Sequence, residues 1–299
     1  MLPDIKKFFN IRNPLFQFFI FLSIFVGIAQ FDLLFFAKTQ ADQTRFLFQL
    51  IIAIVSAVLL YLATTSLLKI SHPNPLNILI SSLIAYILIH PSNPWFFLPL
   101  TVGMIGLGKY LVRYKNLPLF NPAALGLFLT YYLTLFLEKL GLIHNSLLIS
   151  WWGADMQQSF LKDWPLINIA FSLILLFTFL YFVNKYNKSV YVATAFVTYS
   201  IAILLYQNMT IGGFVAPLRF LSATIFTSFS FLLLVMMTEP KTSPNLQKHQ
   251  SIIGLIGGLV LFIFTFYLPE HTSFSFAEPF ISTVLVMNLL TMLFKEKLS

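Results

Sequence analysis

The sequence predicts an all-α, polytopic membrane protein, and three observations carry this prediction. Hydrophobic residues make up 58% of the 299 residues and charged residues only 9%, against roughly 25% charged residues in soluble domains. Ten apolar segments follow one another along the chain. The loops between these segments alternate between rich and poor in Lys and Arg, which is the pattern that orients helices in a bilayer.

Each apolar segment is read as one helix, since a membrane-spanning helix needs about 20 apolar residues. The third segment is short, and the eighth is interrupted by Gly212, Gly213 and Pro217. Re-entry of one or two short segments is therefore an alternative to ten full spans. The segments cover residues 14–37, 46–68, 76–90, 95–112, 121–142, 165–184, 188–207, 211–237, 251–269 and 277–294.

The basic residues predict an orientation with both termini in the cytoplasm. The residues preceding the first segment lack a cleavage site of small residues, so that segment is expected to stay as a helix. Four basic residues then fall in outside loops: Lys38, Arg45, Lys139 and Lys162. Thirteen fall in inside loops or at the ends: Lys6, Lys7, Arg12, Lys69, Lys109, Arg113, Lys115, Lys185, Lys188, Lys241, Lys248, Lys295 and Lys297. This bias favours cytoplasmic termini in a cell (inner) membrane.

The chain is expected to form a single membrane domain, residues 1–299, made of two five-helix halves over residues 14–142 and 165–294. An odd number of helices per half makes the halves inverted relative to each other. The irregular third and eighth segments occupy equivalent positions, as paired interrupted segments do in inverted-repeat transporters. Coincidence is the alternative, because Gly and Pro are common in membrane helices and the halves show no convincing residue-level similarity.

Asn121 and Pro122 open the fifth segment. Asn suits the N-cap of a helix and Pro its first turn. The free N–H groups at such a helix start can face an anion or a polarised ring. A plain cap without further function is the alternative.

A polar turn, Thr238-Glu239-Pro240-Lys241-Thr242-Ser243-Pro244, follows the eighth segment directly. It combines two prolines, three hydroxyls and an acid at the predicted inner boundary of the membrane. Such a rigid turn can line a cytoplasmic vestibule for an ion or a cofactor. A solvated loop is the alternative.

Arg219 is the one basic residue placed within a segment. Ionisable groups at membrane depth usually face a cavity or a partner, although Arg219 lies near the outer end and can also snorkel to the surface. The chain has no cysteine, so it cannot hold a thiolate-ligated iron–sulfur cluster by itself. The spacing of the histidines predicts no metal site.

Three blocks together resemble a known family, the membrane subunit shared by the Rnf electron-transport complex (its D subunit) and the sodium-pumping NADH:quinone oxidoreductase (its B subunit). The first block is the run from Ile80 to Trp95, which ends in a Pro-x-x-Pro-Trp turn. The second is Phe120-Asn121-Pro122-Ala123-Ala124. The third runs from Leu221 through Thr238 to Ser243 and on to the glycines at 254, 257 and 258, and Asn288 in the last segment also fits.

This resemblance implies a redox-driven ion pump subunit with ten helices in two inverted halves, similar to urea channels. Asn121, Thr238, Glu239, Thr242, Ser243 and Arg219 become the candidate cofactor-binding residues. The partners implied are other membrane, flavin or iron–sulfur subunits, with Na+ or H+ as the ion and no nucleic acid.

The family usually carries FMN esterified to a threonine in the outside loop between the fifth and sixth helices. Here that loop, Leu148 to Pro165, contains no threonine. Asp155 stands near the acceptor position but cannot form the phosphoester that a threonine hydroxyl forms. We therefore expect no covalent FMN. A noncovalent flavin packed on Trp151, Trp152 or Trp164 is compatible with the sequence, although such tryptophans more often anchor a loop at the interface. A channel or carrier on the same scaffold, and a scaffold subunit, are the alternative functions.

Overall fold

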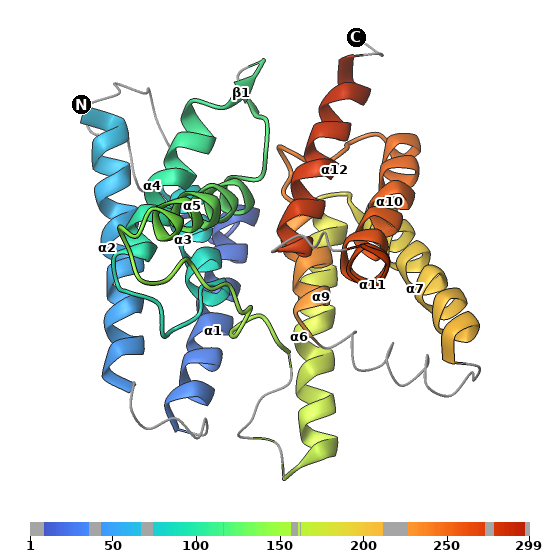
Figure 1. Ribbon diagram of the computed structural model, residues 1–299, viewed down its shortest axis with the longest axis horizontal. Coiled ribbons are helices and arrows are strands. Elements are labelled where there is room, and N and C mark those ends of the chain that lie inside the picture. The colour runs from blue at the N-terminus through green and yellow to red at the C-terminus, as the bar shows by residue number, and fades with distance from the viewer. Residues whose placement is uncertain are drawn as a thin grey trace. The chain divides into compact units, whose positions relative to one another are not determined.

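The computed structural model describes residues 9–35, 43–66, 74–115, 117–156, 161, 163–211, 227–272 and 278–296. The fold is helical, with one small hairpin (Figure 1). The prediction of an all-α protein is confirmed at this level. Arg219, the glycines at 212 and 213, and the residues from Leu221 to Thr224 lie outside the described residues.

Five of the described helices are long and apolar enough to cross a membrane, and two shorter ones, over Pro75–Leu88 and Pro279–Phe294, are also apolar. This agrees with a membrane protein, while ten spans and an inverted repeat stay predictions. The five stretches are Pro14–Leu34, Leu47–Ser66, Leu166–Lys185, Ser189–Thr210 and Gln247–His271.

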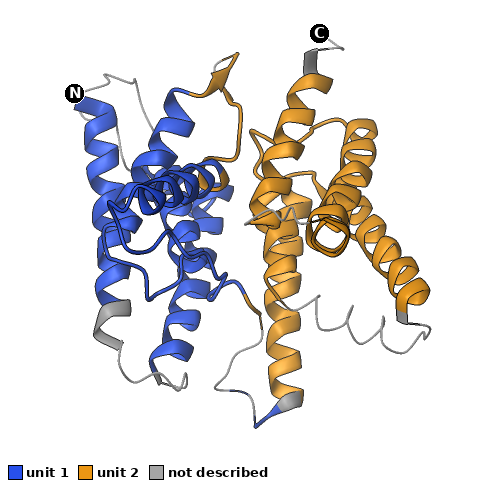
Figure 2. Ribbon diagram, in the orientation of Figure 1, with its two compact units in different colours: residues 1–111, 125–154, 158–164 blue, residues 112–124, 155–157, 165–299 orange. Residues whose placement is uncertain are grey.

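The chain forms two compact units, coloured separately in Figure 2. The first comprises residues 1–111, 125–154 and 158–164. It contains α1 (Pro14–Phe35), α2 (Gln43–Ser66), α3 (Pro75–Leu88), α4 (Phe97–Tyr110) and most of α5 (Pro122–Lys139). Helix α3 packs against α1, α2 and α4, and the Ser82 hydroxyl on α3 donates to the carbonyl of Ala53 on α2 at 2.8 Å.

The long loop after α5 is attached to the C-terminal end of α3. The side chain of Asn93 donates to the carbonyl of Leu148 and accepts from its N–H, at 2.7 and 2.9 Å. The indole N–H of Trp152 donates to the carbonyls of Tyr86 and Ile89. The indole bonds, together with the N–H groups of Ser150 and Gly153 that donate to the carbonyls of Leu88 and Ile87, satisfy carbonyls at the end of α3 that have no intrahelical partner.

The second unit comprises residues 112–124, 155–157 and 165–299. A hairpin of β1 (Arg113–Tyr114) and β2 (Leu117–Pro118) pairs antiparallel. The remaining elements are α6 (Pro165–Lys185), α7 (Ser189–Ile211), α9 (Ser228–Phe231), η4 (Leu232–Met236), α10 (Gln247–Phe262), η5 (Ile263–Tyr267), α11 (Leu268–His271) and α12 (Pro279–Glu296).

Helix α10 packs most extensively on α7 and also on α12. Its glycines make this close packing possible, because a Cβ at Gly258 would lie 2.6 Å from the carbonyl oxygen of Ala195 on α7. Gly257 instead faces Met287 of α12. The two segments η4 and η5 are π-helical, a wide turn that often marks functional sites. Segment η4 leads directly into the polar turn that begins at Thr238.

Candidate functional site

Asn121 caps α5, as its sequence position predicts. Its side-chain Oδ1 accepts hydrogen bonds from the N–H groups of Ala123 and Ala124, at 3.0 and 3.2 Å. Pro122 then occupies the first helical position, where its missing N–H costs nothing. Asn121 is buried, with 3% of its surface exposed, so its remaining polar groups need partners within the protein.

Those partners come from two distant parts of the second unit. The N–H of Asn121 donates to Oδ1 of Asn288 on α12 at 2.6 Å, and its side-chain Nδ2 donates to the carbonyl of Met236 at the end of η4 at 2.9 Å. Nδ2 of Asn288 donates in turn to the carbonyl of Thr242 at 3.3 Å. Asn121 is therefore more than a cap, because it joins the start of α5 to η4 and α12.

The turn from Thr238 to Ser243 closes around Glu239. The Thr242 hydroxyl donates to the Glu239 carboxylate at 2.6 Å. The Ser243 hydroxyl and the N–H groups of Thr242 and Ser243 all converge on the carbonyl of Glu239. Thr238 donates its hydroxyl back to the carbonyl of Leu234 at 2.7 Å. The three hydroxyl-bearing side chains are buried, and Glu239 is half-buried, so the turn is an ordered part of the unit.

The structure thus brings five of the six sequence-predicted site residues into one polar junction, together with Asn288. The sixth, Arg219, lies outside the described residues. The sequence did not single out Lys188, which bonds the carbonyls of Ser243 and Pro244, or Gln250, which bonds the carbonyl of Asn245 directly after the turn. Lys188 counted only as a loop charge, although it is 1% exposed. Its place within the short connection between α6 and α7 was the available signal.

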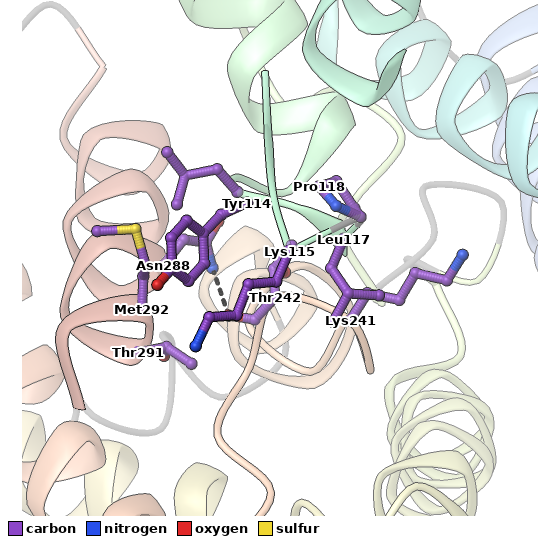
Figure 3. A pocket seen from close by; sticks show the side chains of 10 residues that line it. Tyr114, Lys115, Leu117, Pro118, Lys241, Thr242, Asn288, Thr291 and Met292 are labelled. Atoms are coloured by element: carbon purple, nitrogen blue, oxygen red, sulfur yellow. Dashed lines mark hydrogen bonds between the residues drawn. The ribbon is translucent and has the colours of Figure 1, made fainter. Parts of the chain in front are cut away.

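A pocket of about 100 Å³ adjoins the junction (Figure 3). The hairpin, the polar turn and α12 line it, and it includes Thr242 and Asn288. Lys115 lies at the rim of the pocket, with its Nζ 5.4 Å from the centroid of the Tyr114 ring. The side chain of Lys241 points away from the pocket. The volume is well below the roughly 300–1,000 Å³ of pockets that enclose drug-sized ligands. The pocket therefore suits an ion or a small group better than a three-ring flavin.

The loop after α5 has structural roles. Trp151 is buried, and Trp152 holds the end of α3 through its indole N–H. Trp164 is 63% exposed. The Asp155 carboxylate accepts the N–H of Ser228 at 2.9 Å. Burial raises the pKa of Asp155, and the hydrogen bond from Ser228 partly offsets this rise.

Comparisons with known proteins identify no family. No protein-family profile matches the chain, and no curated protein sequence matches it significantly.

Proposed function

We propose that this chain is a membrane subunit of a redox-driven, ion-translocating electron-transport complex that carries no covalent FMN. One observation carries the proposal. The two blocks of the resemblance at Asn121 and at Thr238–Ser243 are hydrogen-bonded together through Asn288, which belongs to the same resemblance. Met236 and Asn288, which lie 115 and 167 residues after Asn121 in the sequence, thereby meet it in one polar junction.

In this proposal the junction serves a cofactor or ion on the cytoplasmic side. Thr242 and Asn288 line the pocket, and Asn121, Thr238 and Ser243 hold the polar junction behind it. In the proposal, the nearby carboxylate of Glu239 supplies the negative charge for a Na+ or a proton. Arg219 remains a candidate for the outer part of the path. The redox group belongs to a partner flavin or iron–sulfur subunit, or is a noncovalent flavin. The chain itself is then an electron-relaying or non-catalytic subunit.

A channel or carrier for an ion or small solute is the second candidate, and the loop after α5 favours it. Trp152 and Asp155 are both used to hold neighbouring elements. Trp152, one of the tryptophans that could pack a flavin, and Asp155, near the position of the acceptor, are thus engaged with the protein itself. A scaffold subunit, which keeps the helices but carries no electrons, is equally compatible with this loop.

The flavin content of the purified protein separates these candidates. We expect an intact mass without added FMN after co-expression with a flavin transferase, because the loop from Leu148 to Pro165 offers only the hydroxyls of Ser150 and Ser159, neither in an S-x-A-T context. A yellow protein that loses its absorbance near 450 nm on acid precipitation supports the electron-transport subunit. A protein colourless at every stage favours the channel or scaffold. A fluorescent band on a denaturing gel contradicts the proposal of no covalent flavin.

Single-cysteine labelling tests the predicted orientation in this cysteine-free chain. Lys115, at the exposed tip of the hairpin, and Ser150, exposed in the loop after α5, are suitable positions. In intact cells an impermeant maleimide should label Ser150→Cys and leave Lys115→Cys unlabelled until the membrane is opened. The reverse labelling pattern would overturn the orientation drawn from the Lys and Arg distribution.

A further inference from the structure

Lys188 is a buried lysine whose ammonium lies among oxygen atoms of the polar turn. Its Nζ donates to the carbonyl of Pro244 at 2.8 Å and to the side-chain Oδ1 of Asn245 at 2.7 Å. The carbonyl of Ser243 is a more distant third acceptor at 3.4 Å. Three oxygens match the three donors of an ammonium group, and the two short contacts have the length of charge-assisted hydrogen bonds.

The backbone holds Lys188 rigidly in this position. Helix α6 ends in a Schellman arrangement, in which Asn187 has a φ of 55° and its N–H donates to the carbonyl of Asn184. The N–H of Lys188 then donates to the carbonyl of Val183, as the motif requires. The carbonyl of Lys188 accepts from Val192 and so starts α7.

Gln250 of α10 closes the same region from the other side. Its Nε2 donates to the carbonyls of Asn187 and Asn245, at 2.6 and 3.1 Å, and its Oε1 accepts the N–H of Tyr191. The α6–α7 connection and the segment after Ser243 are therefore held together by two buried side chains. The oxygens around the Lys188 ammonium do not depend on Lys188 alone for their positions.

We infer that the oxygens of Ser243, Pro244 and Asn245 form a monovalent-cation site, which the ammonium of Lys188 occupies as a tethered cation. Carbonyl oxygens that replace a hydration shell are the ligands by which proteins bind K+, and an ammonium ion has similar size and charge. Lys188 thus positions the polar turn by supplying a cation that never dissociates. This role holds whether or not the chain transports electrons.

Removing the ammonium should convert the protein to one that depends on free cations. We expect Lys188→Met to lower the melting temperature of the purified protein by roughly 5 °C or more in N-methylglucamine chloride, because buried acceptors lose their charged partner. Potassium or ammonium chloride at equal ionic strength should restore at least half of this loss in a saturable manner. Intrinsic tryptophan fluorescence provides the melting curve.

Lys185→Met is the matched control, since Lys185 lies at the same connection but is not buried and donates to the Tyr181 hydroxyl. Both this variant and the wild type should respond equally little to the choice of cation. A Lys188→Met protein that melts with the wild type, or whose loss no monovalent cation restores, overturns the inference. Lys188→Gln keeps a neutral donor and decides the matter if the methionine variant cannot be purified. Wild-type stability of Lys188→Gln rejects a cation site, and stability regained only with potassium or ammonium supports it.

Discussion

Replacing Asn121 by alanine is expected to destabilise the protein by roughly 3 kcal/mol, well beyond the loss of a helix cap. The substitution removes the cap of α5 and the hydrogen bond to Met236, and it leaves that carbonyl buried without this donor. A lowered melting temperature in detergent, measured by tryptophan fluorescence, reports the loss. In the proposed complex, the same substitution should reduce electron transfer together with stability.

Asn74→Ala provides a control for the capping contribution. Asn74 also precedes a proline at a helix start, and its Oδ1 accepts the N–H of Leu76 at 3.0 Å. Its loss should cost about 1 kcal/mol, as for an ordinary cap. Equal losses for Asn74→Ala and Asn121→Ala would mean that Asn121 is a plain cap and that its side-chain bond to the carbonyl of Met236 contributes nothing.

Adding a single methyl group at Gly258 is expected to cost roughly 2 kcal/mol or more through overpacking. The new Cβ would lie 2.6 Å from the Ala195 carbonyl oxygen and 2.9 Å from the Tyr199 nitrogen. Both are backbone atoms of α7, so α10 must move away from the helix on which it packs most extensively. We expect Gly258→Ala to accumulate poorly in the membrane and to melt at a lower temperature.

Gly103→Ala is the opposite case in α4, because a Cβ there meets no atom within 4 Å. Alanine favours a helix over glycine by about 0.5–1 kcal/mol, so this variant should be unchanged or slightly more stable. Similar losses for both substitutions would contradict overpacking against α7 as the cause of the effect at Gly258.

The sequence predicts a helix well where an Asn-Pro pair precedes a long apolar run, as at Pro14, Pro75 and Pro122. In each case the fixed φ of proline and the capping asparagine mark the first turn. The third apolar segment was expected to be short, and α3 has 14 residues. The inverted arrangement of the halves stays a prediction, because apolar periodicity carries no information about how helices are placed in space.

The candidate site was only partly accessible from sequence. Local chemistry identified Asn121 as a cap and the turn at Glu239 as rigid, and the resemblance included Asn288. No local pattern predicts that the N–H of Asn121 donates a hydrogen bond to the side chain of Asn288, 167 residues away. Lys188 shows the same limit, since a lysine in a short loop is ordinarily a solvated charge. Its burial depends on where the segment from Ser243 to Asn245 returns in the fold.

The π-helical turn at η4 affects how this chain aligns with homologous sequences. Such a turn holds one residue more than an α-helical turn, so the Met237 N–H reaches back to the carbonyl of Leu232. In a homologue with an ordinary α-helix here, every later residue would be rotated by about 100° unless one residue were missing. An alignment should therefore place a single-residue gap within 232–236, directly before Thr238. Without this gap, the polar turn of such a homologue would be aligned one residue out of register.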